Sequence, residues 1–246
     1  MNSGQPGEYR KDRLVSIVLP SHNEEGSIAD IIGDLFLHVG DPVEIIVVDD
    51  DSTDRTRAII AEMNDPRIVL THRKRTKGLA SAILRGVMES RGEIILWIDV
   101  DAWMMPPLLP AMIEMLNEHD AVVASRYVTG GGDERELSRV IASRLINGWA
   151  RLCLGDHLKD YTSNFVVVRR EVFDYVMPTP VGFGEFFIEL VYRASRKGLS
   201  VVETPYILKD RREGASKASA NWPRFLKLGL RYFFRIIRVR ISGAGE

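Results

Sequence analysis

The sequence lacks the cysteines and the long apolar runs that several protein classes require. Its 246 residues include one cysteine, Cys153, so no intrachain disulfide can form. No stretch reaches the roughly 18 consecutive apolar residues expected of a transmembrane helix. Residues 1–13 are polar and contain glycine and proline, without the apolar segment of a signal peptide. We therefore expect a disordered leader at residues 1–13 and a cytoplasmic protein of a reducing compartment.

The sequence has no excess of positive or negative charge: its 34 acidic and 33 basic residues leave a net charge of −1. The composition therefore gives no reason to expect a nucleic-acid partner. The basic residues are nevertheless unevenly placed, since six of them and no acid fall between residues 224 and 240. They are Arg224, Lys227, Arg231, Arg235, Arg238 and Arg240.

The pattern of residues 221–246 predicts a basic amphipathic helix and tail. At 100° per residue the first five cations fall within about 80° of one another, and the other faces are apolar and aromatic. Such a helix is typical of proteins that bind a membrane surface without crossing the bilayer. The alternative is a C-terminal helix packed on its own domain with its basic face in solvent.

Apolar runs rich in β-branched residues alternate with helical patterns in the first hundred residues. Strands are predicted at 14–19, 43–48, 67–71 and 94–96, and helices at 28–39, around 58–63 and at 77–91. Ser52 or Thr53 is expected to cap the second helix. This alternation predicts βαβ units and a mainly parallel sheet, and the length fits one α/β domain with a small C-terminal addition.

Two carboxylates follow the strand predicted at 94–96. Asp99 and Asp101 are two positions apart, so in an extended chain they point to the same side. Ligands of open α/β sheets bind beyond the carboxyl ends of the strands. Because Mg²⁺ typically takes one or two protein carboxylates and completes its shell with water and phosphate, the pair predicts a metal site. The alternative is an ordinary acid pair in a loop or at a helix cap.

Four short motifs occur in order over residues 14–110. They are Pro20-Ser21-His22-Asn23-Glu24, Val48-Asp49-Asp50-Asp51-Ser52-Thr53-Asp54, Lys77-Gly78-Leu79-Ala80-Ser81-Ala82 and Asp99-Val100-Asp101. Together they resemble the motifs of family 2 glycosyltransferases. The resemblance implies a GT-A (Rossmann-like) α/β fold, a single domain at residues 14–220, and transfer of a sugar from a nucleotide-diphosphate donor.

Further motifs in the second half narrow the resemblance. They are Ala124-Ser125-Arg126-Tyr127 with Gly130-Gly131-Gly132, Asp160 to Phe165, Arg169 to Phe173, Gly182 to Phe186 with Glu189, and Glu203 to Tyr206 followed by Arg211 to Lys217. They are similar to segments of dolichol-phosphate mannose synthases and related polyprenyl-phosphate glycosyltransferases. Three positions depart from the family pattern: His22 replaces a tyrosine, Asn164 replaces a glycine, and Trp103 stands where relatives carry a polar residue.

The resemblance implies a role for individual residues. The donor would be bound by Pro20, His22, Glu24, Val48, Asp50, Asp99, Val100, Asp101, Arg211 and Lys217. Asp99 and Asp101 would hold Mg²⁺ or Mn²⁺, and Arg126, Arg139 and Ser143 would bind the acceptor phosphate, with Asp101 and Arg126 as the catalytic residues. Arg139 and Ser143 are four residues apart and so share a helix face. The alternative for this pair is an ordinary exposed helix rich in charge.

The implied reaction is an inverting, metal-dependent transfer of a hexose, with mannose favoured, to a polyprenyl (dolichyl-type) phosphate. A phosphate monoester has a second pKa of about 6, so this acceptor needs no carboxylate base. GDP-mannose is favoured over UDP-glucose as donor, and a UDP-glucose-dependent polyprenyl-phosphate glucosyltransferase is one alternative.

The sequence is also compatible with two other functions. A family 2 enzyme acting on a saccharide hydroxyl would need a base, for which Asp133, Glu134, Glu136 or Glu185 is available. The third hypothesis is a catalytically silent nucleotide-sugar sensor or scaffold. For the favoured function we expect a peripheral protein on the cytoplasmic face of a membrane, and the resemblance also allows a membrane-anchored partner subunit.

Overall fold

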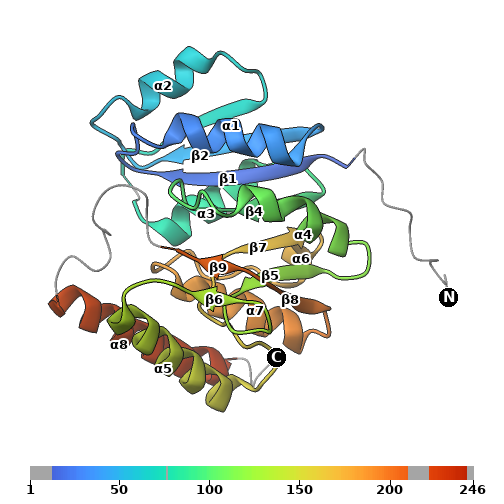
Figure 1. The fold of residues 1–246 in the computed structure, drawn as a ribbon, viewed down its shortest axis with the longest axis vertical. Coiled ribbons are helices and arrows are strands. Elements are labelled where there is room, and N and C mark those ends of the chain that lie inside the picture. Colours follow the sequence, from blue (N-terminus) through green and yellow to red (C-terminus); the bar gives the residue numbers. More distant parts are fainter. Residues whose placement is uncertain (1–12, 76, 210–221, 243–246) are drawn as a thin grey trace.

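A seven-stranded sheet with helices on both faces forms the frame of the molecule (Figure 1). The computed structural model describes residues 13–75, 77–209 and 222–242. The strand order is β3-β2-β1-β4-β7-β5-β8, and β6 and β9 form a separate two-stranded sheet. The strands are β1 Val15–Ser21, β2 Val43–Asp49, β3 Ile68–His72, β4 Ile94–Trp97, β5 Ala121–Ser125, β6 Gly132–Asp133, β7 Val166–Arg169, β8 Val201–Pro205 and β9 Ile207–Leu208.

Two apolar cores lie on the two faces of the large sheet. The helices are α1 Ile28–Val39, α2 Thr56–Met63, α3 Leu79–Glu89, a 3₁₀ turn Pro106–Leu108, α4 Leu109–Met115, α5 Leu137–Leu154, α6 Val172–Tyr175, α7 Glu185–Arg196 and α8 Trp222–Ser242. α1, α2 and α4 contribute to one core, and α3 and α5 to α8 contribute to the other. Within β1, Ile17 and Leu19 point into the first core and Val18 into the second, because successive side chains of a strand alternate.

The order of the strands reverses at β1. The chain runs from β1 outward to β2 and β3 in parallel, then returns through α3 to place β4 on the other side of β1, also in parallel. The connections after β1 and β4 therefore leave the sheet in opposite directions, which opens a crevice at the carboxyl ends of these strands. The predicted mainly parallel GT-A-like sheet is confirmed, and the predicted strands and helices up to residue 97 are present with ends shifted by up to two residues.

One detail of the sequence-based prediction is wrong, and one feature of the sheet was not predicted. Arg55, not Ser52 or Thr53, is the residue that precedes α2. The hydroxyl of Ser52 donates to Asp49, and the first-turn Thr56 N–H donates to Asp54 Oδ1 at 3.0 Å. β7 is antiparallel to both β4 and β5, a direction that its run of valines does not encode.

The C-terminal helix α8 packs against α5 and α7 (Figure 1). Ile236 and Val239 are buried in the core that these helices share. Arg235 donates to Glu189 of α7 at 3.0 Å and its side chain is 9% exposed. The expectation that all five cations face lipid is therefore wrong for Arg235. Among the described residues, no helix is long and apolar enough to span a bilayer.

We predict opposite effects of adding one methyl group at two helical glycines. A Cβ at Gly86 of α3 would lie 2.3 Å from Val18 Cγ1 of β1, so Gly86→Ala should lower the free energy of unfolding by about 1–3 kcal/mol through overpacking. A Cβ at Gly33 of α1 meets nothing within 4 Å, so Gly33→Ala should raise it by about 0.5–1 kcal/mol. Urea denaturation of both variants measures this, and equal effects would contradict the close packing of α3 on β1.

Candidate active site

The loops that follow β1 and β2 are joined by backbone and side-chain hydrogen bonds. The contacts are Asp50 N to Ser21 O at 2.8 Å, Asn23 N to Ser52 Oγ at 2.9 Å, Glu24 N to Thr56 Oγ1 at 2.8 Å and Thr53 N to Asn23 Oδ1 at 2.8 Å. Asn23 and Asp51 hold φ values of 55° and 60°, in the left-handed region that Asn and Asp tolerate. The two loops therefore form one fixed edge at the mouth of the crevice.

This edge carries several of the residues predicted to bind the donor. His22 is exposed and its Nδ1 lies 2.9 Å from the Asp50 carbonyl oxygen, while Pro20 and Glu24 are half-buried beside it. Val48 and Val100 are buried in the two cores. The side chains of these two valines therefore belong to the cores and not to the surface of the crevice.

Asp50 connects the end of β2 to the segment that leads into α3. Its carboxylate accepts hydrogen bonds from Arg73 Nε and from the Gly78 N–H, both at 2.7 Å. Arg73 also donates to Ser81 Oγ at 3.0 Å. Sequence reasoning missed Arg73; the signal was the basic run of residues 73–75 directly after β3. Asp50 therefore fixes the segment that leads into α3.

The neighbouring Asp51 has a different environment. It accepts from Lys77 Nζ at 2.9 Å and lies 3.1 Å from His72 Nε2. The hydrogen bond from Lys77, and then that from His72, lowers the pKa of Asp51 to about 2. Asp51 is therefore an anion over the whole physiological range of pH.

Asp99 and Asp101 follow the carboxyl end of β4, which lies beside β1, the strand at which the strand order reverses. The Ile98 N–H extends the pairing with β1 by donating to Val18 O at 3.2 Å, and the Ala102 N–H closes a turn on Asp99 O at 2.9 Å. Both carboxylates are half-buried. Over residues 13–75, 77–209 and 222–242, no group of three or more His, Cys, Asp or Glu side chains is arranged to hold a metal. Two carboxylates fit Mg²⁺ or Mn²⁺ if diphosphate and water supply the other ligands.

A second polar cluster surrounds Arg126, directly after β5. The guanidinium is buried and makes a two-point contact with Asp160, from Nε at 2.7 Å and from Nη2 at 2.6 Å. Nη2 also donates to Thr162 Oγ1 at 2.7 Å, and Nη1 lies 3.4 Å from Asp133. Burial by itself lowers the pKa of Arg126, but the charge of Asp160 outweighs it and keeps the pKa above its ordinary value. The charge of Arg126 is thus permanent and already shared with Asp160.

Helix α5 brings Ser143 into the same cluster. Ser143 Oγ lies 3.3 Å from Thr162 Oγ1, and Asn147 Nδ2 donates to the same oxygen at 2.8 Å. Arg139 is half-buried one turn before Ser143, on the face of α5 that points inward. The structure therefore brings Arg126 and Ser143 together and places Arg139 beside them. Thr162 and Asn147 were missed from the sequence, where no spacing links them to Arg126.

Carboxylates near this cluster are engaged by arginines or backbone N–H groups. Asp133 is buried and lies 2.7 Å from Arg135 Nη2; burial raises its pKa, but Arg135 and Arg126 bring the net value below the ordinary one. Glu185 accepts from the Phe183 N–H at 2.8 Å and lies 3.7 Å from Arg231.

Two of the remaining residues singled out in the sequence, Asn164 and Trp103, are described by the structure, and two others are not. Asn164 has a φ of 66°, so the asparagine keeps the left-handed turn expected of a glycine. Trp103 is half-buried after Asp101. Arg211, Lys217 and the first twelve residues lie outside the described residues, and their predicted roles stay predictions.

Removal of Asp160 should destabilise the fold. Asp160→Asn removes the carboxylate that contacts the buried guanidinium of Arg126 at two points and leaves only Asp133, 3.4 Å away, so the free energy of unfolding should fall by up to roughly 3–5 kcal/mol. The matched control is Asp156→Asn, which removes an exposed carboxylate from Arg151 and Lys159 and should leave stability unchanged within error. Chemical denaturation compares the two, and a small effect at residue 160 would contradict the structural role of the pair.

Comparisons with known proteins identify the family. The family model described as glycosyl transferase family 2 matches residues 16–177. The dolichol-phosphate mannosyltransferase of Pyrococcus furiosus is 31% identical over 230 residues, covering 91% of this chain and 64% of the relative. The polyprenol monophosphomannose synthase of Mycolicibacterium smegmatis is 31% identical over 227 residues, covering 88% and 85%. The chain therefore spans somewhat less than two thirds of the length of the Pyrococcus relative.

Solved structures share the fold at lower identity. The glucosyl-3-phosphoglycerate synthase of Mycobacterium tuberculosis, in complex with Mn²⁺, uridine diphosphate and phosphoglyceric acid, superposes with a TM-score of 0.72 at 18% identity, over 93% of this chain and 78% of that one. The same enzyme with Mg²⁺ and uridine diphosphate gives 0.69 at 19% identity, over 95% and 80%. With the family model covering more than half of the sequence, the chain belongs to glycosyl transferase family 2.

Proposed function

We propose that this chain transfers a hexose, with mannose favoured, from a nucleotide-diphosphate sugar to a polyprenyl phosphate, with inversion at the anomeric carbon. One observation carries the choice of acceptor: the buried carboxylates around the Arg126 cluster are engaged by arginines or backbone N–H groups. The names of the two curated relatives, which describe mannosyl transfer to dolichol phosphate and polyprenol monophosphomannose synthesis, support the same choice.

The argument from the carboxylates is one of proton transfer. A sugar hydroxyl is a weak nucleophile and needs a carboxylate base with a pKa near the working pH. Asp133 carries a lowered pKa beside Arg135, and Glu185 is held by Phe183 and Arg231. A phosphate acceptor is largely dianionic at neutral pH, so it attacks without losing a proton. Glu134 and Glu136 are exposed and remain the candidate bases for the saccharide alternative.

The donor would lie in the crevice beside β1 and β4. The fixed edge formed by the loops after β1 and β2 would orient the nucleoside against His22 and Glu24. A divalent cation held by Asp99 and Asp101 would supply positive charge for the departing diphosphate. Solved structures of the same fold contain Mn²⁺ or Mg²⁺ together with uridine diphosphate, which supports the choice of ion. Arg211 and Lys217 are proposed to contact the diphosphate from their segment of the chain.

The acceptor phosphate would lie against the inward face of α5, near Arg139 and Ser143. Its oxygen forms the new bond to the anomeric carbon, while the bond from that carbon to the diphosphate breaks and the diphosphate keeps the electron pair. Arg126 donates a hydrogen bond to Thr162, which in turn contacts Ser143. Arg126 therefore positions these side chains although its charge is largely neutralised by Asp160. A direct contact of Arg126 with the phosphate stays part of the proposal.

Mannose from GDP-mannose is preferred over glucose from UDP-glucose because of the relatives' names. A peripheral position on the cytoplasmic face of a membrane, and a membrane-anchored partner subunit, belong to the same proposal. A catalytically silent sensor is disfavoured, because Asp99, Asp101 and the Arg126 cluster are all in place at the ends of β4 and β5.

Asp101→Asn should abolish transfer while the fold is retained. The substitution removes one of two anionic ligands of the proposed cation, so metal-dependent donor binding should weaken severely. The control is Asp174→Asn, at an exposed position of α6, which should keep full activity. Turnover is measured over a Mg²⁺ titration, with circular dichroism to verify folding. Near-normal turnover of the Asp101 variant with unchanged Mg²⁺ dependence would exclude this metal site.

Arg139→Ala should impair use of the acceptor and spare the donor. A charge-assisted contact to phosphate contributes roughly 1.5–3 kcal/mol, so the apparent affinity for a short, water-soluble polyprenyl phosphate should fall about ten- to a hundredfold. Arg144→Ala is the matched control, because Arg144 lies on the exposed side of the same helix. Donor affinity is measured by calorimetry and acceptor affinity by kinetics. Loss in the donor measurement alone would remove Arg139 from the acceptor site.

A further inference from the structure

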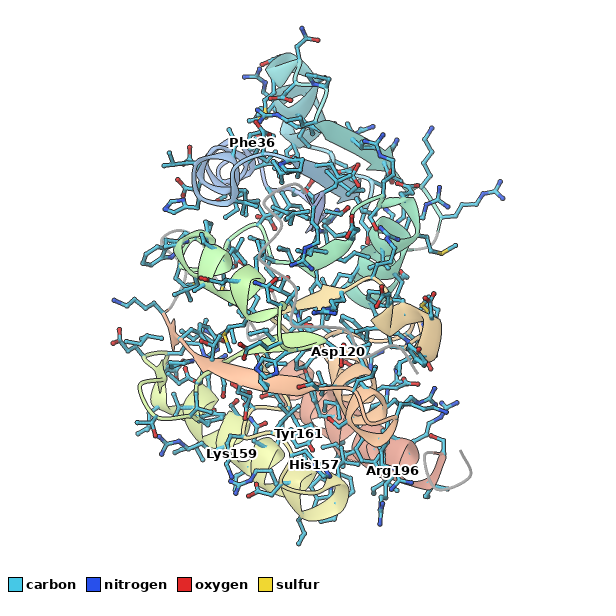
Figure 2. All side chains as sticks on the ribbon, turned by 90° about the vertical axis from the view of Figure 1, so that its right-hand side faces the viewer. Phe36, Asp120, His157, Lys159, Tyr161 and Arg196 are labelled. Carbon is cyan, nitrogen blue, oxygen red and sulfur yellow. The ribbon has the colours of Figure 1, made fainter. Side chains whose placement is uncertain are left out.

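The buried face of α8 includes a tyrosine. Tyr232, Ile236 and Val239 are spaced by four and three residues, so they lie on one face of the helix. That face packs on the core that α8 shares with α5 and α7, at the end of the molecule opposite to Phe36 of α1 (Figure 2). Tyr232 carries its hydroxyl group at the far end of an apolar ring, and a tyrosine hydroxyl that is buried usually has polar surroundings.

The hydroxyl group of Tyr232 lies over Gly184, the residue that precedes α7. A Cβ at Gly184 would clash with Tyr232 Oη and would lie 3.5 Å from Cζ of the same ring, so the glycine leaves room for the hydroxyl group. Nearly one turn further along α8, Arg235 Nη2 donates to Val181 O at 2.6 Å. Helix α8 therefore binds the loop that leads into α7 at two points, and these contacts fix the position of the hydroxyl group.

The loop that leads into α7 lies between the start of α3 and the end of β4. The ring of Phe186, in the first turn of α7, packs against Trp97 at the end of β4, with centroids 5.7 Å apart. Asp99 follows two residues after Trp97. At the other side of the loop, the Ala80 N–H of α3 donates to Gly182 O in a long hydrogen bond of 3.4 Å. The loop therefore lies at the crevice in which the donor is proposed to bind.

Charges from both halves of the proposed site act on the hydroxyl group of Tyr232. Burial, and then the negative charge of Glu185, raises the pKa of Tyr232 above its ordinary value. The positive charge of Arg126 acts in the opposite direction, and the carboxylates of Asp99 and Asp160 add to the rise. The phenol therefore keeps its proton at neutral pH. Because both Asp99 and Arg126 act on it, the hydroxyl group lies near the proposed metal site and near the acceptor cluster.

The group that passes between these two parts of the site is the hexose. In the proposed reaction the diphosphate stays with the cation at Asp99 and Asp101, and the acceptor phosphate stays beside the Arg126 cluster. The sugar ring lies between them during transfer. A hexose presents hydroxyl groups that both donate and accept hydrogen bonds, and the neutral hydroxyl group of a tyrosine can do the same.

We propose that Tyr232 is a substrate-binding residue whose hydroxyl group forms a hydrogen bond with the transferred hexose of the nucleotide-sugar donor. This inference rests on the proposed function and names a further residue of the same site. It also changes the role of the C-terminal segment, which the sequence presents as an addition outside the domain. Through Tyr232, α8 is part of the site itself, and the contact of Arg235 with Val181 holds the hydroxyl group in place before the donor binds.

The test compares Tyr232→Phe with wild type in calorimetric titrations with GDP-mannose and with GDP, both in the presence of Mg²⁺. The variant lacks one hydrogen bond between neutral groups, so its affinity for GDP-mannose should fall about two- to tenfold. Its affinity for GDP should stay unchanged, because GDP has no hexose. The matched control is Tyr192→Phe, since Tyr192 is a buried tyrosine of α7 whose hydroxyl group accepts from Arg240 of α8 at 3.2 Å. The control should bind both ligands like wild type.

Two results of the titrations would overturn the proposal. One is an unchanged affinity of Tyr232→Phe for GDP-mannose. The other is an equal loss of affinity for GDP-mannose and for GDP, because the hydroxyl group would then act on the nucleotide or on the fold. If wild type binds UDP-glucose more tightly than GDP-mannose, UDP-glucose and UDP replace the first pair of ligands, with the same expected difference.

A further pair of variants tests the position of the hydroxyl group without any ligand. Gly184→Ala places a methyl group against Tyr232 Oη, so it should lower the urea concentration at the midpoint of unfolding. In the Tyr232→Phe background the obstructing oxygen is absent, so the same substitution should lower the midpoint clearly less. Equal effects in the two backgrounds would show that the hydroxyl group does not lie over Gly184 and would also overturn the proposal.

A transfer assay separates this inference from the proposed function. Wild type that binds GDP-mannose but transfers no hexose to a polyprenyl phosphate would refute the proposed function, and the comparison of GDP-mannose with GDP would still decide the role of Tyr232. Wild type that binds neither GDP-mannose nor UDP-glucose would refute both.

Discussion

The reversal of strand order at β1 is the constraint on which the rest of the structure depends. Because β2 and β4 flank β1 and all three run in parallel, the connections that follow them diverge and leave a crevice at the carboxyl edge. The segments that follow β1 and β2 at that edge would be flexible loops if they made no contact with each other. The hydrogen bonds between the segments after β1 and β2 hold these loops in one arrangement instead. The position of the crevice, and with it that of the proposed donor site, therefore depends on the topology of the sheet more than on particular side chains.

Buried charge is paired at each point where two halves of the site meet. Asp50 binds Arg73 on the proposed donor side, and Asp160 binds Arg126 on the proposed acceptor side. Such pairs contribute little net stability, because desolvation offsets attraction, but removal of one partner is costly. They therefore specify geometry. Asp133, one of the candidate bases for a saccharide acceptor, is paired with Arg126 and Arg135 in the same way, which favours the proposed acceptor that arrives as an anion.

The sequence predicted what depends on local periodicity and missed what depends on contacts distant in the chain. The positions of β1 to β4 were predicted from apolar runs, because strands that are buried on both faces are continuous apolar segments. The helices between them were predicted from their own periodicity. The partners of Asp50 and Arg126 are 23 and 34 residues away, and no spacing rule links them. Periodicity also identified the basic side of α8 but could not show that Glu189 already binds Arg235. Periodicity tells which residues share a face, not what covers it.

Helix α5 shows how that limit bears on function. Its inward face includes Ser143 and Asn147, which share the hydroxyl of Thr162, while leucines point outward. The inward face also carries Val140, Ala150 and Leu154, so α5 combines a partly polar inward face with apolar residues in solvent, which a surface helix usually avoids. The polar groups inside are tolerable because Thr162 and Arg126 supply their partners, so burial costs little. The exposed leucines of α5 gain no hydrophobic stabilisation, because they remain in contact with water. The inward face of α5 is therefore accounted for by the domain itself, and its outward leucines are the part of the helix that the packing of the domain does not explain.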